Sequence, residues 1–206
     1  KSYSLDAELL LSKVLRSTRE NLILNLSNKI DKKYFNQFQK LILRRKNNEP
    51  IAYIFKNKEF WKYKFYVDKK VLIPRPETEI IVSEILKLTN KNSSKHILDI
   101  GTGSGCILIS IMKERPNCYG TAIDISKNAL KVALINAKMH QLKNKIKLIN
   151  IDIDKYEYNK YDLIVSNPPY INSIDLKRLE NNVKLYEPHV ALNAGIDGLS
   201  EIRKLI

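Results

Sequence analysis

The chain has 206 residues, 44% of them hydrophobic, and its 36 Lys and Arg against 22 Asp and Glu give a formal net charge of +14. This length accommodates a single core, or a small domain beside a larger one. We find no apolar run near the roughly 18 residues of a membrane span, and no secretory signal. The composition therefore excludes an integral membrane protein, and we predict no membrane partner.

The cysteines and histidines of the chain bear on its compartment and on metal binding. Cys106 and Cys118 both lie among apolar residues. Two such thiols fit a reducing compartment, so we expect a cytoplasmic location. His96, His140 and His189 have no metal-ligand spacing with the cysteines, and we predict no metal site.

The positive charge is unevenly distributed. Residues 1–95 carry 21 Lys and Arg against 10 Asp and Glu, a net of +11, whereas residues 96–206 carry 15 against 12, a net of +3. A basic N-terminal half fits an acidic or nucleic-acid-bound partner. The alternative, lysines scattered over solvated faces, stays open, because no basic stripe interleaved with aromatic residues is present.

The N-terminal part of the sequence has a helical pattern. Apolar residues have helical spacing at 5–15 and again at 35–42. The next four residues, Asn47-Asn48-Glu49-Pro50, are of types that end helices. We therefore assign residues 1–50 to a small helical domain.

A strand pattern follows. Between Trp61 and Val67 apolar residues alternate with lysines and a tyrosine, a period of two that predicts a half-buried strand. Asp68-Lys69-Lys70 has turn chemistry, so we expect this strand to pair with Val71-Leu72-Ile73. Pro74-Arg75-Pro76 forms a stiff extended link. Residues 51–76 are predicted to be a β-hairpin and linker.

From residue 77 onward helices and strands alternate. We predict helices at 77–89, 106–113 and 127–140, and strands at 96–100, 119–123, 147–151 and 163–166. Such alternation is typical of βαβ units, in which a parallel sheet is built with right-handed crossovers. The expected fold class is α/β, with residues 77–206 as its sheet domain.

A glycine-rich loop stands directly between the first predicted parallel strand and its helix. Its residues are Gly101, Thr102, Gly103, Ser104 and Gly105. Glycines there let the backbone turn tightly and approach a ligand closely. The loop has neither the spaced glycines of a dinucleotide fold nor the Lys-Ser/Thr of a phosphate loop.

Acidic and amide side chains follow the other predicted strands. Asp124, Asp152 and Asn167 each come at a strand end, so they share one edge of the sheet. Asp124 is placed to bind both hydroxyls of a ribose. Asp99, just before the glycines, would repel a phosphate and suit a cationic amino-acid group. A nucleoside with such a group is S-adenosylmethionine, which we predict as the cofactor.

Asn167-Pro168-Pro169-Tyr170 follows the last predicted strand. A Pro-Pro pair cannot continue a sheet, because it removes two backbone donors and fixes φ. The carboxamide oxygen of Asn167 and a main-chain oxygen then form a socket for a planar NH₂ group. This geometry suits an enzyme that modifies an amide or exocyclic amine nitrogen, although a plain turn after a strand has the same Asn-Pro signature.

These motifs together resemble the release-factor glutamine methyltransferases, the HemK/PrmC family. The resemblance covers essentially the whole chain and is most specific in Ile73-Pro74-Arg75-Pro76-Glu77-Thr78-Glu79. The other matching segments are Asp6–Leu11, Glu49–Ile54, Glu59–Trp61, Leu98–Gly105, Asp162–Ile171, Tyr186–Pro188, Ala191–Leu192 and Gly195–Leu199.

The resemblance implies a fold and an activity. The sheet domain would be a Rossmann-like class I methyltransferase domain, and the helical region would dock the substrate. Such enzymes transfer a methyl group from S-adenosylmethionine to the side-chain amide nitrogen of the glutamine in the Gly-Gly-Gln loop of peptide-chain release factors. Release factors are therefore the expected partners.

The resemblance also implies roles for particular residues. Asp124 would bind the cofactor ribose, and Asp152 and Ile153 would line the adenine. The segment Asn167, Pro168, Pro169 and Tyr170 would hold and orient the glutamine, with Tyr170 packed on the amide plane. Arg75 and Glu77 either flank the active-site entrance as a hinge or form a structural Arg–carboxylate pair.

The chain departs from the family pattern in two respects. Asn48, Lys56 and Lys62 stand where glycine is expected, and Ile153 stands where an aromatic residue is common. The family sheet has more strands than the four predicted here, so we expect a sheet truncated after four parallel strands, in a piece of a longer chain that could carry a second activity.

Two other functions compete with this one. An adenine-N6 methyltransferase acting on DNA or RNA would present its exocyclic amine to the same Asn-Pro-Pro-Tyr socket, with the basic N-terminal half as a nucleic-acid clamp. The second competing function is a binding module that keeps the cofactor-binding fold but catalyses no methyl transfer. The run from Pro74 to Glu79 favours the glutamine family over both.

Overall fold

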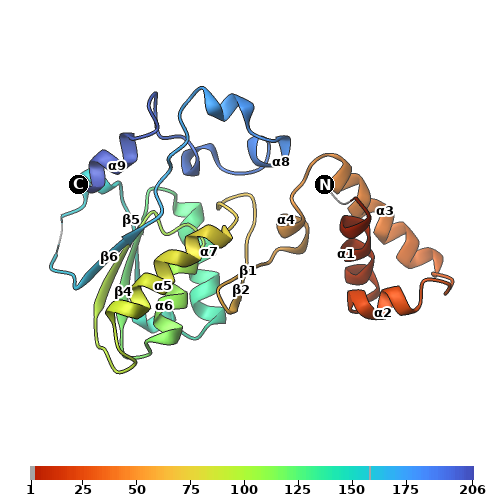
Figure 1. Cartoon of the computed structure of the whole chain (residues 1–206), viewed down its shortest axis with the longest axis horizontal. Helices are drawn as coiled ribbons and strands as arrows, with labels where there is room; N and C mark the ends of the chain where they lie inside the picture. The colour runs from red at the N-terminus through yellow and green to blue at the C-terminus, as the bar shows by residue number, and fades with distance from the viewer. Residues whose placement is uncertain (1–2, 158) are drawn as a thin grey trace. The chain divides into compact units, whose positions relative to one another are not determined.

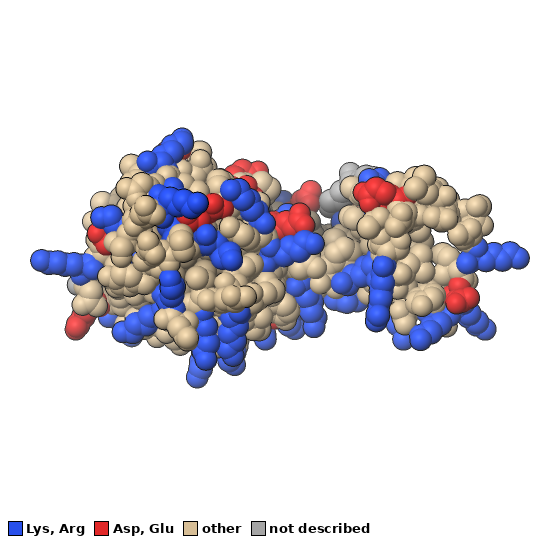
Figure 2. All heavy atoms as spheres, turned by 90° about the horizontal axis from the view of Figure 1, so that it is seen from below, with Lys and Arg blue, Asp and Glu red and all other residues tan. Residues whose placement is uncertain are grey.

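A computed structural model describes residues 3–157 and 159–206 of the chain (Figure 1). The chain divides into two compact units, Lys1–Phe55 and Lys56–Ile206. Lys and Arg side chains outnumber Asp and Glu on the face drawn in Figure 2, as the net charge requires. No helix among the described residues is long and apolar enough to cross a membrane.

The first unit is helical, as the sequence predicts. Its helices are α1 (Tyr3–Leu15), α2 (Arg19–Leu24), α3 (Lys32–Lys46) and α4 (Ile51–Phe55). Thr18 caps α2 by accepting a hydrogen bond from the Asn21 N–H, and Arg45 of α3 pairs with Asp6 of α1 at 2.6 Å. The unit extends to Phe55 because α4 belongs to it, whereas the sequence places the boundary after residue 50.

The predicted hairpin exists with a different pairing. Strand β1 (Lys58–Phe60) pairs with β2 (Tyr63–Phe65), and the turn between them is Trp61-Lys62. Trp61 has a φ of 57°, and its N–H donates to the Glu79 carboxylate at 2.8 Å. The expected pairing with residues 71–73 is wrong, because the Ile73 N–H is engaged by Glu187 instead of a strand.

The second unit is built on a four-stranded parallel sheet, as predicted. Its strands are β3 (His96–Ile100), β4 (Tyr119–Asp124), β5 (Ile146–Asn150) and β6 (Leu163–Ser166), in the order β5-β4-β3-β6. Adjacent strands are all parallel. Residue 97 of β3 pairs with 120 of β4 and 163 of β6, so the carboxyl ends of the strands align at one edge.

Three helices cover one face of this sheet: α5 (Glu79–Leu88), α6 (Cys106–Glu114) and α7 (Lys127–Met139). Alternate strand residues such as Ile97 and Val165 pack against them in the main core. The intervening Leu98, Ile100 and Ile123 form a smaller core on the other face. The two central strands, β3 and β4, are buried along most of their length, whereas the outer strands β5 and β6 each have exposed residues.

The remaining segments connect and cover these elements. Short 3₁₀ turns occur at η1 (Pro76–Thr78), η2 (Lys143–Lys145) and η3 (Ile153–Lys155). After β6 the chain forms η4 (Asp175–Arg178), α8 (Asn181–Lys184), η5 (His189–Ala191) and α9 (Ser200–Leu205). A parallel bridge between Ile171 and Asn193 ties this segment together.

Candidate active site

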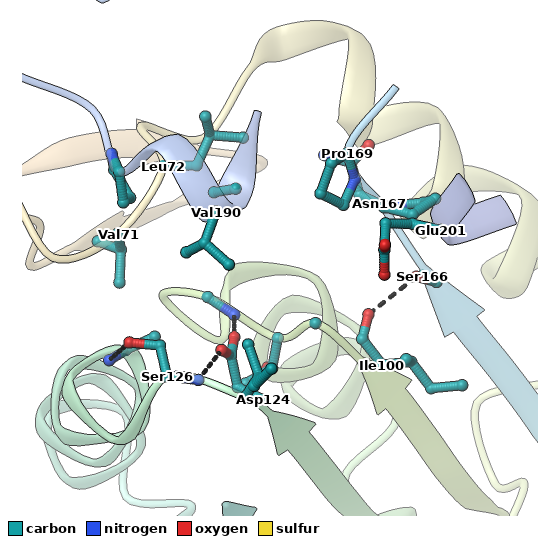
Figure 3. A pocket seen from close by; sticks show the side chains of 18 of the residues that line it. Val71, Leu72, Ile100, Asp124, Ser126, Ser166, Asn167, Pro169, Val190 and Glu201 are labelled. Atoms are coloured by element: carbon teal, nitrogen blue, oxygen red, sulfur yellow. Dashed lines mark hydrogen bonds between the residues drawn. The ribbon is translucent and has the colours of Figure 1, made fainter. Parts of the chain in front are cut away.

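A cavity of about 410 Å³ lies at the carboxyl edge of the parallel sheet. Ile100, Asp124 and Ser166, from the ends of β3, β4 and β6, line it together (Figure 3). This is the edge where open α/β folds bind ligands, because the strand order places loops with free backbone groups there. The volume is in the range of small-molecule sites.

The glycine loop forms one wall of the cavity. Gly101 and Gly103 have φ of 70° and 56°, which a residue with a Cβ adopts at a cost. The N–H groups of Gly101 and Thr102 both donate to the Ile123 carbonyl, at 2.9 and 3.1 Å. These bonds fold the loop over the end of β4, and a Cβ at Gly101 would meet no atom within 4 Å, so this position is open for a ligand.

Gly105 is the member of the loop that does not line the cavity. It precedes α6 with a φ of 79°, and an added Cβ would lie 3.1 Å from the Ile109 side chain and 3.5 Å from Ala133. Its smallness allows α6 and α7 to approach each other. Thr102 and Ser104 line the cavity, and both are buried.

Asp124 is held at the cavity by two backbone bonds. The Gly103 N–H donates to Oδ2 at 2.9 Å and the Ser126 N–H donates to Oδ1 at 2.8 Å (Figure 3). A carboxylate has about four lone-pair sites, so each oxygen retains one for a diol. Burial raises the pKa of Asp124, and the two backbone bonds oppose that shift.

Asp99 lies outside the cavity lining, with 1% of its surface exposed. The Thr102 hydroxyl donates to its Oδ2 at 2.6 Å. Among the described residues, no group donates a hydrogen bond of good geometry to its Oδ1. The nearby Leu108 N–H nevertheless favours the carboxylate and opposes the rise in the pKa of Asp99. Burial, with the Asp124 carboxylate as a smaller cause, raises the pKa of Asp99 to about 7.

Asp152 and Ile153 line the cavity after β5, where the sequence places them. The Asp152 side chain accepts from the Asp154 N–H at 3.1 Å and starts η3. Ile153 packs on the small core around Ile100. The two side chains therefore stand on the same edge as Asp124, and their role toward an adenine stays a prediction.

Asn167, Pro168 and Pro169 line the cavity after β6. The Asn167 Nδ2 donates to the Thr78 hydroxyl at 3.4 Å. Within the described part of the chain nothing donates to its Oδ1 or to the Pro168 carbonyl. Tyr170 is 64% exposed and does not line the cavity, so its expected packing on a substrate stays a prediction.

Arg75 lines the cavity, whereas Glu77 does not. Arg75 Nη2 pairs with Glu187 Oε1 at 2.6 Å, and Glu187 Oε2 accepts from the Ile73 N–H at 3.1 Å. Arg75 is therefore part of an Arg–carboxylate pair, but its partner is Glu187, 112 residues away in the sequence, and not Glu77 as weighed from the sequence.

Several residues of the cavity received no functional role from the sequence, although Thr78, Pro188 and Ala191 lie in segments that match the family. The residues without a predicted role are Lys70, Val71, Leu72, Thr78, Ser126, Pro188, His189, Val190, Ala191, Glu201 and Lys204. Ser126 has the signature of a helix N-cap, and its side chain does accept from the Ala129 N–H. The residues after Pro188 line the cavity because the chain folds back over it after α8. No local sequence pattern predicts this path.

Among the described residues, no three His, Cys, Asp or Glu side chains form a group that could hold a metal ion. Cys106 and Cys118 are both free and buried. Burial raises the pKa of the Cys106 thiol to about 12, so this thiol stays protonated and packs as an apolar group.

The fold and the cavity define the class of the second unit as a methyltransferase domain. The family model described as "Methyltransferase small domain" matches residues 77–182, and the model described as "PrmC N-terminal domain" matches residues 1–55. A crystallised RNA methyltransferase from Salinibacter ruber is similar with a TM-score of 0.41 and 21% identity, over 51% of this chain and 65% of that chain.

The chain belongs to the release factor glutamine methyltransferase family. It is 40% identical over 205 residues to the release factor glutamine methyltransferase of Buchnera aphidicola subsp. Baizongia pistaciae, across 100% of this chain and 73% of that protein. It is also 40% identical over 214 residues to the bifunctional methyltransferase of Rickettsia typhi, across 95% of this chain and 41% of that protein.

S-adenosylmethionine is the methyl donor that this class implies, and the residues present fit it. Gly101 offers open space beside the loop backbone, and Asp124 keeps lone pairs for a ribose diol. Asp152 and Ile153 stand next along the sheet edge for a base. Three Lys and Arg side chains line the described cavity, and each is paired with a carboxylate: Arg75 with Glu187, Lys204 with Glu201 and Lys70 with Asp68. A pyrophosphate would therefore find no unpaired Lys or Arg among these lining residues.

Proposed function

We propose that the protein transfers a methyl group from S-adenosylmethionine to the side-chain amide nitrogen of the glutamine in the Gly-Gly-Gln loop of a peptide-chain release factor. The observation that carries this proposal is the state of the Asn167 side chain. Its Nδ2 is engaged by Thr78, while Oδ1 and the Pro168 carbonyl have no donor in the described chain. Two acceptors beside a cofactor-sized cavity suit a primary amide.

An amide nitrogen is a poor nucleophile, because its lone pair is delocalised into the carbonyl. When bound, S-adenosylmethionine would supply a methyl group on a sulfonium, and its sulfur would keep the electron pair of the S–C bond. Asn167 Oδ1 and the Pro168 carbonyl accept the two N–H groups and orient the nitrogen toward the methyl carbon. They also stabilise the positive charge that develops on nitrogen.

No general base is required before methyl transfer, since the proton leaves the nitrogen to water afterwards. Complete positioning of two reactants is worth roughly 7–11 kcal/mol. The chain therefore contributes mainly orientation and the exclusion of water. Asp124 and the glycine loop hold the cofactor, and the segment after β6 holds the amide.

The first test offers the protein a radiolabelled methyl donor with two kinds of substrate. One is an unmodified release factor with its Gln→Ala loop variant, and the other is adenine-containing DNA and RNA. We expect label on the release factor that disappears with the Gln→Ala change. Label on nucleic acid alone would instead establish the adenine-N6 activity, and no transfer to either would favour a binding module.

Asn167→Ala gives the residue-level test of the same proposal. Loss of one positioned acceptor is expected to lower kcat by about 10²–10³-fold, because the acceptor acts on the transition state. The affinity for S-adenosylhomocysteine, measured by calorimetry, should change by less than about fivefold, since a lost neutral hydrogen bond is worth about 1 kcal/mol. Near-normal turnover would remove Asn167 from the mechanism.

A further inference from the structure

A strap of chain, residues 70–78, runs along the cavity and ends in η1 before α5. Lys70, Val71, Leu72, Pro74, Arg75 and Thr78 of this strap line the cavity. Figure 3 shows Val71 and Leu72 across the cavity from Asp124. The strap forms no strand, so the sheet ladders do not fix its position. Its position must come from side-chain contacts.

Glu187 provides those contacts in the middle of the strap. The carboxylate is 1% exposed, and it accepts from the Arg75 guanidinium at 2.6 Å and from the Ile73 N–H at 3.1 Å. A buried carboxylate requires such partners, because an unpaired buried charge costs several kcal/mol. The residues that follow Glu187, from Pro188 to Ala191, line the same cavity. Glu187 thus joins two cavity walls that are far apart in the sequence.

Thr78 provides the contact at the end of the strap. Its hydroxyl accepts from Asn167 Nδ2 at 3.4 Å. A carboxamide has a donor side and an acceptor side of nearly the same shape, and a rotation of 180° exchanges them. In the structure Nδ2 faces the Thr78 hydroxyl of the strap, and Oδ1 is left for a substrate N–H.

We propose that Glu187, Arg75 and Thr78 are positioning residues for methyl transfer. The Glu187–Arg75 pair sets the strap, the strap sets Thr78, and Thr78 holds the Asn167 carboxamide with its oxygen toward the substrate amide. None of the three needs to touch the reacting atoms. The inference rests on the proposed function for its kinetic readout, but the orientation of Asn167 is measurable without turnover.

The kinetic test compares Thr78→Val with Thr78→Ser. Valine keeps the shape of threonine and removes the acceptor, whereas serine keeps the hydroxyl. We expect Thr78→Val to lower kcat about fivefold to tenfold, as loss of one neutral hydrogen bond predicts, with KM for the release factor and affinity for S-adenosylhomocysteine within about twofold of wild type. Thr78→Ser should restore most of kcat. Equal kcat in Thr78→Val and wild type would overturn the role of Thr78.

The second test concerns the Glu187–Arg75 pair and uses Arg203→Gln as a control in a more exposed ion pair. Arg203 pairs with Asp197 at the same distance, 2.6 Å, in the same C-terminal segment, and it does not line the cavity. Arg75→Gln and Glu187→Gln are expected to lower kcat at least as much as Thr78→Val. Arg203→Gln should leave kcat unchanged. Equal effects in all three variants would show only a general structural role and would contradict the proposal.

An NMR measurement separates this inference from the proposed function. In ¹⁵N-labelled protein, the two side-chain N–H signals of Asn167 should be shifted and slow to exchange in the wild type. They should move toward free-amide values in Thr78→Val and in Glu187→Gln. If the wild type fails to methylate release factors, the proposed function fails, while these signals still decide whether the strap orients Asn167. Signals unchanged in both variants would overturn the inference.

Discussion

Asp99, in β3, is a carboxyl group that the fold buries beside a second one. Its pKa is raised to about 7, first by burial and then by the Asp124 charge, against the Thr102 hydrogen bond. In an unfolded chain an Asp titrates near pH 4. Between about pH 4 and pH 7 the folded chain therefore holds a proton that the unfolded chain has lost. The contribution of Asp99 to the free energy of unfolding falls as pH rises through that window, and is constant above it.

We predict that Asp99→Asn removes this pH dependence. The free energy of unfolding of the variant minus that of the wild type should be larger at pH 8 than at pH 5, by roughly 3 kcal/mol. Denaturant unfolding of both proteins at the two pH values measures it. A difference that does not change with pH would show that Asp99 ionises normally in the folded chain.

Lys56 illustrates a position where the backbone prefers glycine. It follows α4 with a φ of 55°, as Asn48 follows α3 with a φ of 65°. Residues just beyond a helix C-terminus commonly adopt this left-handed conformation, which costs a residue with a Cβ about 1–2 kcal/mol. The structure thus accounts for the glycines expected from the family at these two positions. Lys62 does not have a positive φ. In this turn the residue with the positive φ is Trp61.

Lys56→Gly is therefore expected to raise the free energy of unfolding by about 0.5–1 kcal/mol, after the entropy cost of glycine is subtracted. Thermal or denaturant unfolding measures the change. Lys62→Gly is the control, since it adds a glycine without relieving strain, and it should be neutral or destabilising. Stabilisation by both variants would mean that loss of positive charge is the cause.

At the scale of single residues, the sequence predicts the cavity residues whose position depends only on the strand that they follow. Glycines at a strand end and Asp124 after the next strand were identifiable, because strand-end position alone brings them to one edge. Thr78 and Glu187 were not assigned their partners, since those partners are 89 and 114 residues away in the sequence. Such contacts depend on tertiary packing and leave no periodic signal.

Among the elements, α7 carries a polar side chain that joins three parts of the second unit. Asn136 is fully buried, and its Nδ2 donates to the Ser104 and Tyr66 carbonyls at 2.8 and 3.0 Å. Its Oδ1 accepts from the Tyr66 N–H at 2.7 Å. The helix therefore holds the glycine loop on one side and the chain after the hairpin on the other.

Asn136→Ala should lower the free energy of unfolding by about 3 kcal/mol or more, because it leaves buried backbone groups without partners. It should also weaken S-adenosylhomocysteine binding, since the glycine loop loses its contact with α7. Asn144→Ala, at an exposed position in η2, is the control and should change stability by less than about 0.5 kcal/mol. Comparable losses in both would contradict a special role for Asn136.

The hairpin shows where prediction of elements fails. Alternation between Trp61 and Val67 correctly indicated extended, half-buried chain, but it could not fix the pairing. The register is set by the turn at Trp61, which is stabilised by Glu79 from another element. By contrast, the strands and helices between residues 96 and 166 lie within one or two residues of their predicted places, because apolar runs separated by turn residues leave little choice. No bounds were predicted for the short helices after residue 166.

At the scale of the whole molecule, a net charge of +14 has consequences that do not depend on the active site. Positive proteins bind nucleic acids through phosphate contacts, with an affinity that falls steeply with salt. We expect weak, sequence-independent binding of a labelled single-stranded oligonucleotide at 50 mM salt and a loss of about tenfold or more at 200 mM. Fluorescence polarisation measures this binding.

The same samples, supplied with labelled methyl donor, should show no label on the oligonucleotide. Methyl transfer that accompanies binding would support the adenine alternative, and binding that is insensitive to salt would argue for a specific nucleic-acid site. The charge thus makes simple binding a poor criterion of function for this molecule. Transfer to a defined atom is the criterion that distinguishes the two activities.

Strand β6 is at one end of the sheet order, and it pairs only with β3 among the described strands. Its register has four residue pairs, whereas β3–β4 and β4–β5 each have five. Asn167 follows this strand, while Asp124 ends the strand between β3 and β5. Strand β3 pairs with β4 on one side and with β6 on the other. The separation between the nucleoside side of the cavity and the amide socket is therefore set by one strand, the same one that leads into the glycine loop.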